Sequence, residues 1–184
     1  AQAMWDEYDA DLKAIDADIA KKTEDLRRQE AAAAAAGKSG SAVNGSGSLM
    51  WPGTSNVVTS LYGTREHPVH KVLLTHHGID LRAAYGSKIY AADSGTVITA
   101  AYSSSYGNYI VIDHGSSGMT TLYAHMSKLN VKNGQAVTKG DVVGYAGSTG
   151  TATATHLHFE VAVNGERQNP LNYFSGGYVI KDGA

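Results

Sequence analysis

Two short histidine motifs in the second half of the chain have the residue types and spacing of a metal site. His76 and Asp80 form an H-x-x-x-D pair that would project from one face of an extended segment, because strand side chains alternate between faces. Gly78 between them leaves that face uncrowded. His156 and His158 form an H-x-H pair that shares a strand face, while their apolar neighbours turn to the other face. Core packing alone does not explain such a strand.

These residue types favour catalytic zinc. A catalytic zinc site has three protein ligands and leaves a fourth position for water. The chain has no cysteine, so histidine and carboxylate must supply the ligands. His76, Asp80 and one histidine of the H-x-H pair would complete the set, and the residues alone leave open whether that is His156 or His158. Bound zinc lowers the pKa of water towards ~7 and polarises a carbonyl, which is the chemistry of hydrolysis.

Hydrolysis at such a site also needs an unligated imidazole to move protons. The other H-x-H histidine and His125, at the end of an apolar strand, are the candidates, because histidine titrates near neutral pH. A purely structural zinc is disfavoured, since structural sites usually have four protein ligands, often cysteines. The remaining histidines are predicted not to bind metal: His67, His70, His77 and His114.

The residues that would position these histidines read as a mainly β domain. Short apolar alternations are separated by turns that contain glycine, and strands of this kind are typical of a β-sheet. They cover residues 88–92, 95–100, 109–113, 120–125 and 158–163. Asn164 and Gly165 predict a tight hairpin turn, because both central positions of such a turn favour positive φ.

The N-terminal segment has a different pattern. Apolar residues recur three and four positions apart, which predicts an amphipathic helix with a coiled-coil stripe. The stripe comprises Trp5, Tyr8, Leu12, Ile15, Ile19 and Leu26. We expect residues 5–26 to pair with another helix, from an upstream segment, a second copy or another protein. The alternative is that the helix packs on its own domain.

Between the helix and the β domain lies a segment rich in glycine and serine. Its composition over residues 37–48 is that of a flexible linker. The predicted organisation is therefore a helical segment at 1–36, a linker at 37–48 and a zinc-binding domain at 49–184. The sequence begins at Ala1 with neither an initiator methionine nor a signal-peptide pattern, so we read it as a mature or excised fragment.

Charge and hydropathy exclude two classes of partner. The formal net charge is −2. Residues 1–30 hold nine acidic and five basic side chains, so the rest of the chain is only faintly basic. A nucleic-acid partner is not expected, because the dense basic surface of a phosphate binder is missing. No membrane span is expected either, since no apolar run approaches ~20 residues.

Together the motifs resemble the lysostaphin/LytM family of zinc peptidases over about residues 51–174. The shared segments are residues 62–68 (YGTREHP), 76–81 (HHGIDL), 91–97 (AADSGTV), 106–114 (YGNYIVIDH), 122–126 (LYAHM), 134–137 (GQAV), 140–144 (GDVVG), 155–161 (THLHFEV) and 169–171 (NPL). The resemblance implies a compact antiparallel β peptidase domain with a groove for an extended peptide. It also implies that the substrates are peptidoglycan stem peptides or cross-bridges, and that the protein acts outside the cell or in the cell envelope.

The resemblance also assigns residue roles. His76, Asp80 and His158 would be the zinc ligands, and His125 and His156 the unligated catalytic pair. Some family members that follow an N-terminal coiled coil have lost ligands and activate other wall hydrolases without cutting. A non-cleaving module that binds the wall or regulates a hydrolase through its coiled coil is therefore the alternative. Because this sequence retains every ligand and both catalytic histidines, it predicts an active zinc endopeptidase.

Overall fold

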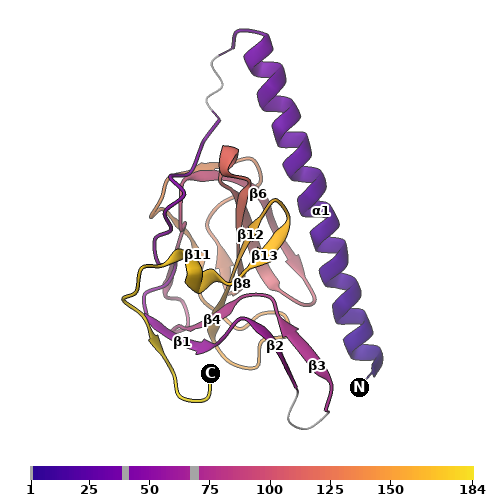
Figure 1. The fold of residues 1–184 in the computed structure, drawn as a ribbon, viewed down its shortest axis with the longest axis vertical. Helices are drawn as coiled ribbons and strands as arrows, with labels where there is room; N and C mark the ends of the chain where they lie inside the picture. Colours follow the sequence, from indigo (N-terminus) through magenta and orange to yellow (C-terminus); the bar gives the residue numbers. More distant parts are fainter. Residues whose placement is uncertain (1, 39–41, 67–70) are drawn as a thin grey trace.

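A computed structural model describes residues 2–38, 42–66 and 71–184 of the chain. It confirms a mainly β protein behind one N-terminal helix (Figure 1). In chain order the elements are α1 (Gln2–Ala35), β1 (Val57–Ser60), β2 (Gly63–Glu66), β3 (Leu73–His76), β4 (Ile79–Arg82), β5 (Lys88–Tyr90), β6 (Gly95–Ser103), β7 (Gly107–Asp113), η1 (Gly115–Ser117), β8 (Met119–Met126), β9 (Lys128–Leu129), β10 (Ala136–Val137), β11 (Val142–Tyr145), β12 (His156–Val163), β13 (Glu166–Gln168), η2 (Pro170–Tyr173) and β14 (Val179–Ile180).

One large sheet carries most of the domain. Its strand order is β10-β6-β7-β8-β12-β4-β1-β14, with β13 added to β12. The neighbours are antiparallel apart from β1 and β14, which pair in parallel. Asn164 and Gly165 join β12 to β13 with φ values of 51° and 81°, as the predicted hairpin turn requires. Small sheets formed by β5-β11-β9 and by β2-β3 complete the described part of the domain.

The central strands β7 and β8 are buried on both faces. Alternate residues of β7 belong to different apolar clusters: Ile110 and Ile112 pack in the main core, whereas Tyr109 and Val111 face the helix. This follows from the period of two along a strand. It also explains why residues 109–112 form an unbroken apolar run, since a sheet covered on both faces needs no polar side.

The apolar stripe of α1 packs on the chain's own sheet, so a partner helix is not what buries it here. Leu12 and Ile15 are only 5% and 6% exposed, and Tyr8, Ile19 and Leu26 are partly buried beside them. Burial of each large aliphatic side chain contributes about 1.5–3 kcal/mol to docking. The helix therefore lies along the β domain, as Figure 1 shows. Among the described residues, none of the helices is long and apolar enough to cross a bilayer.

The second half of the predicted linker is attached to the β domain. The buried carboxylate of Asp93 accepts hydrogen bonds from the backbone of Gly47 at 2.9 Å and from the hydroxyl of Ser46 at 3.1 Å. A buried carboxylate is stable only when it accepts hydrogen bonds. The Gly/Ser composition of the linker did not predict that two of its residues would donate them. Residues 39–41 of the predicted linker, and also His67 and His70, lie outside the described residues.

Candidate metal centre

The pairing of β12 with β4 brings the two histidine motifs together. In this antiparallel pair His158 lies opposite Asp80, and His156 lies opposite Arg82. His76 ends β3, so the H-x-x-x-D motif spans two strands rather than one extended segment. Gly78 between them allows close approach, because a Cβ at this position would lie 2.2 Å from the carbonyl oxygen of Phe159.

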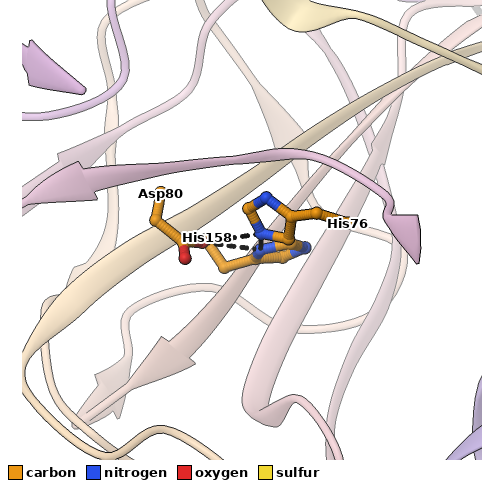
Figure 2. Close-up of side chains that lie close together, drawn as sticks. All are labelled: His76, Asp80 and His158. Atoms are coloured by element: carbon orange, nitrogen blue, oxygen red, sulfur yellow. Dashed lines mark hydrogen bonds and ion pairs between the residues drawn. The ribbon is translucent and has the colours of Figure 1, made fainter. Parts of the chain in front are cut away.

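Three donor atoms converge at this point (Figure 2). Nε2 of His76 lies 3.1 Å from Oδ1 of Asp80 and 3.1 Å from Nδ1 of His158. Nδ1 of His158 lies 2.9 Å from the same Asp80 oxygen. Ligands of a tetrahedral zinc ion at about 2.0–2.1 Å are separated by about 3.3 Å. The triangle of donor atoms is therefore close to the size that zinc requires.

The outer hydrogen bonds of the two histidines turn their lone pairs towards this triangle. Nδ1 of His76 lies 2.8 Å from the carbonyl oxygen of Leu61, and Nε2 of His158 lies 2.9 Å from Oε1 of Glu160. Both oxygens only accept, so these ring nitrogens carry the hydrogens. When both rings are neutral, as metal ligation requires, His76 Nε2, His158 Nδ1 and the Asp80 carboxylate face one another as three electron-rich atoms. A cation between them resolves this arrangement, and the residues fit zinc.

The electrostatics of the site favour a cation as well. Burial alone would lower the pKa of His158, but hydrogen bonds to Asp80 and Glu160 outweigh it and raise this pKa to about 9. Burial would raise the pKa of Glu160, yet the contact with His158 lowers it to about 2. The pKa of Asp80 is likewise held well below its usual range by His158 and His76, against the effect of burial. Both carboxylates are therefore ionised at neutral pH.

His125 and His156 lie beside the triangle, with ring centroids 4.8 Å apart. Nδ1 of His125 donates to the carbonyl oxygen of Thr149 at 2.8 Å, and Nδ1 of His156 donates to that of Ala154 at 2.8 Å. Each ring therefore keeps Nε2 unprotonated when neutral. Burial, together with the neighbouring His158 and His156, lowers the pKa of His125 to about 4, so this ring is neutral at working pH.

A pocket of about 200 Å³ contains all five residues predicted for the site. Its walls are Tyr8, His76, Asp80, Tyr106, His125, Thr151, Ala152, Thr153, His156 and His158. Tyr8 comes from α1, so the helix forms part of the wall. The ring of Tyr106 stacks on that of His158, with centroids 5.7 Å apart.

Sequence reasoning missed the residues behind His158. Glu160 shares the strand face of the two H-x-H histidines, and this parity was the available signal. Arg167 donates from Nε to Glu160 Oε2 at 2.9 Å and also contacts Asp16 of α1. No local sequence pattern predicts the pairing of Arg167 with Asp16. A larger cavity of about 450 Å³, lined by all three of these charged residues, lies between α1 and the sheet.

Two of the other histidines, His77 and His114, lie in the described part of the chain. His114 is buried, with Nδ1 2.8 Å from the carbonyl oxygen of Ser94 and Nε2 2.8 Å from the hydroxyl of Thr121. Both ring nitrogens of His114 are thus used within the domain. His77 is half-buried, and burial lowers its pKa. Neither histidine is part of the described three-residue group that could hold a metal ion.

Comparison with known proteins gives the same family for these motifs. The pattern of Peptidase family M23 matches residues 74–170, just over half of the chain. The peptidoglycan DD-endopeptidase ShyA of Vibrio cholerae is 40% identical over 107 residues, which is 58% of this chain and 25% of that protein. The DD-carboxypeptidase/endopeptidase Mpg of Neisseria meningitidis is 37% identical over 115 residues, which is 62% of this chain and 26% of that one. The chain thus spans about a quarter of the length of these relatives.

Solved structures agree in fold. A zinc-containing peptidase from Vibrio cholerae superimposes with a TM-score of 0.58 at 32% identity, covering 70% of this chain and 41% of that one. The catalytic domain of the antimicrobial peptidase lysostaphin from Staphylococcus simulans gives a TM-score of 0.56 at 31% identity, covering 63% of this chain and 90% of that one. With the sequence pattern, these similarities establish that the chain belongs to peptidase family M23.

Proposed function

We propose that this chain is a zinc-dependent endopeptidase that hydrolyses peptide bonds in bacterial peptidoglycan, within stem peptides or cross-bridges. The observation that carries this proposal is the triangle of His76 Nε2, Asp80 Oδ1 and His158 Nδ1, whose atoms lie 2.9–3.1 Å apart. The name of the relative from Vibrio, a peptidoglycan DD-endopeptidase, supports the substrate class, and that of the relative from Neisseria supports the peptidase activity.

His76, Asp80 and His158 would hold zinc in this proposal. Zinc bound there would act as a Lewis acid that activates water and polarises the scissile carbonyl. The protein's own contribution is orientation. Leu61 and Glu160 fix the ring tautomers of the two histidines, so that each ligating nitrogen points into the site without a hydrogen.

His125 and His156 would transfer protons or stabilise the developing oxyanion. The low pKa of His125 keeps this ring neutral, so its Nε2 can accept a proton from water as the peptide bond is attacked. His156 lies on the same strand face as His158, and its Nε2 is 3.6 Å from Oδ1 of Asp80, beyond hydrogen-bond distance. A donor to the oxyanion would need a hydrogen on Nε2, which the neutral His125 lacks, so His125 fits the role of base and His156 that of donor.

The names of the relatives favour one kind of bond. ShyA is named a DD-endopeptidase, an enzyme that cuts the peptide bond between two residues of D configuration. We extend this preference to the present chain. Because peptidoglycan lies outside the cytoplasmic membrane, the proposal places the protein in the cell envelope or outside the cell.

The domain organisation remains part of the proposal: a helical segment at 1–36, a linker at 37–48 and the peptidase at 49–184. A helix partner for residues 5–26 would have to displace the sheet from the stripe that includes Leu12 and Ile15. The contrasting proposal is a wall-binding module that regulates another hydrolase without cutting. The complete ligand set favours the enzyme.

Digestion of purified peptidoglycan tests the enzyme against the module. The full chain with zinc should release soluble fragments, and both chelation and the His158→Ala change should stop this release. Mass analysis of the fragments would identify the bond. Wall binding without release of fragments by the zinc-loaded chain would instead support the non-cleaving module.

A further inference from the structure

A chain of charged contacts connects helix α1 to the predicted zinc ligand His158. Nε2 of His158 donates to Oε1 of Glu160 at 2.9 Å, and Nε of Arg167 donates to Oε2 of the same carboxylate at 2.9 Å. The two terminal nitrogens of Arg167 then donate to Asp16 of α1, each at 2.8 Å. Four side chains from three elements thus form one continuous network.

Burial increases along this network towards the predicted ligand. The side chain of Asp16 is 44% exposed, that of Arg167 is 18% exposed and that of Glu160 is 6% exposed. A nearly buried carboxylate needs fixed partners, and the two oxygens of Glu160 have His158 on one side and Arg167 on the other. Tyr106 also donates its hydroxyl to Oε1 of Glu160.

The planar shape of the Arg167 guanidinium couples the two ends of the network, Asp16 and His158. Its donors form a rigid planar fork, so the contact to Asp16 fixes the plane in which Nε faces Glu160. The orientation of Glu160 in turn fixes the His158 hydrogen on Nε2, which leaves Nδ1 free to ligate. Without Asp16, rotation about the Arg167 side chain would no longer be restrained from the helix side.

We propose that Arg167 is a positioning residue for the metal site and that Asp16 holds it in place, so that docking of α1 and zinc binding stabilise each other. The inference rests on the proposed role of His158 as a zinc ligand. Coupling between two sites is reciprocal: the factor by which the docked helix raises zinc affinity equals the factor by which zinc favours docking.

Zinc affinity measured by competition with a chromophoric chelator tests the coupling in the full chain. Asp16→Asn should weaken zinc binding by about fivefold, the lower end of usual coupling factors. Arg167→Gln should weaken it by about 10–100-fold, as loss of outer partners of metal ligands commonly does. Because Asp16 is half-exposed, its variant keeps the fold and gives the safer test.

Two matched variants on the same helix serve as controls. Asp25→Asn removes the same charge from an equally half-exposed position, whose ion pair among the described residues is with Lys21, and it should leave zinc affinity unchanged. Arg27→Gln breaks a second helix contact, a 2.6 Å pair with Asp113, without touching Arg167. It should loosen the helix yet weaken zinc binding less than Asp16→Asn does.

Hydrogen exchange of residues 5–26 gives the reciprocal readout. Zinc should slow exchange in the wild-type helix, and this effect should be lost in Arg167→Gln. Equal zinc affinities for Asp16→Asn and Asp25→Asn, or equal losses for Asp16→Asn and Arg27→Gln, would overturn the inference. Zinc binding with intact coupling but without wall cleavage would refute the proposed function alone, and a chain that binds no zinc would refute both.

Discussion

His158 and Asp80 face each other across the β4–β12 pair, with Nδ1 of the histidine 2.9 Å from Oδ1 of the aspartate. Two of the three proposed ligands are thus held by the backbone hydrogen bonds of a central strand pair rather than by a loop. A site built on paired strands is geometrically well defined, because cross-strand neighbours have a fixed separation. His76, at the end of β3, completes it from outside this pair.

The two histidines of the H-x-H motif should differ in one measurement. His158→Ala should lose both zinc and turnover, because two remaining ligands are too few to hold the ion. His156→Ala should keep its zinc and lose about 10²–10⁴-fold in rate, the usual cost of removing a proton carrier or an oxyanion donor. Zinc content measured beside turnover checks both. A zinc-free His156→Ala together with a zinc-replete His158→Ala would reverse the ligand assignment.

His125→Ala should behave like His156→Ala, with zinc retained and turnover reduced by about 10²–10⁴-fold. If the two rings act as a unit, the double variant should be much less impaired than the product of the single losses. Rates measured for the wild type, the two single variants and the double variant form a double-mutant cycle that tests this. Fully multiplicative losses would show that the rings act independently.

Local pattern predicted the strand segments that overlap β5, β6, β7, β8 and β12, and it indicated the site residues that the structure brings together. The alternation in residues 156–160 predicted the face that carries His156 and His158, and Leu157 and Phe159 do pack in the core on the other side. Strand parity needs only a period of two, so it can be read from the sequence. The structure places all five predicted residues around one pocket.

Long-range pairing could not be predicted in the same way. Asp80 and His158 are 78 positions apart, and Asp16 and Arg167 are 151 apart. The helical stripe indicated that one face of α1 is buried, but a period of 3.6 does not identify the surface that buries it. The chain's own sheet and a partner helix would both bury the apolar stripe of α1, so the sequence pattern was compatible with either.

Replacement of Gly78 tests how closely β4 and β12 must approach at the site. A Cβ there would lie 2.2 Å from the carbonyl oxygen of Phe159, so Gly78→Ala must shift one strand. We expect a loss of about 1–3 kcal/mol in the free energy of unfolding, with weaker zinc binding because Asp80 moves. Gly53→Ala is the matched control, since its nearest neighbour would be 3.7 Å away. Equal stability and zinc affinity in the two variants would contradict the steric argument.

The buried histidines predict acid sensitivity of the chelated protein. Burial, with the neighbouring His158 and His156, lowers the pKa of His125 to about 4, and burial also lowers the pKa of His114. Below pH ~6.5 these histidines therefore take up protons in the unfolded chain but not in the folded chain. The free energy of unfolding falls as the pH falls towards 4. His125 contributes up to about 1.4 kcal/mol per pH unit in this window, and His114 acts in the same direction.

Urea unfolding at pH 7.5 and at pH 5.5, both with chelator, measures this effect. His158 opposes the effect between pH 7.5 and 6.5, because its raised pKa of about 9 makes its own contribution to stability grow as the pH falls through this range. The effect of His125 is therefore taken as the difference between the wild type and a His125 variant. His125→Gln should be less sensitive to acid than the wild type by about 1 kcal/mol over this interval. The same loss in both proteins would show that His125 takes up its proton equally well in the folded state.

Tyr8 of α1 should restrict access to the site, because its side chain lines the same pocket as the three proposed ligands and the two catalytic histidines. Burial, with the nearby carboxylates Glu160 and Asp80, raises the pKa of Tyr8 to about 12, so the phenol stays neutral and close to the site. Tyr8→Ala should raise kcat/KM on cross-linked peptidoglycan by about 2–10-fold, since a larger fraction of molecules would be open to a peptide strand. Its zinc affinity should fall by less than that of Asp16→Asn, because the docked molecules keep the contact between Asp16 and Arg167. Tyr85→Ala, which alters a tyrosine that is 73% exposed and does not line the pocket, is the control and should leave kcat/KM unchanged. If Tyr8→Ala lowers kcat/KM while zinc remains bound, the tyrosine contributes to substrate binding and the helix belongs to the working groove.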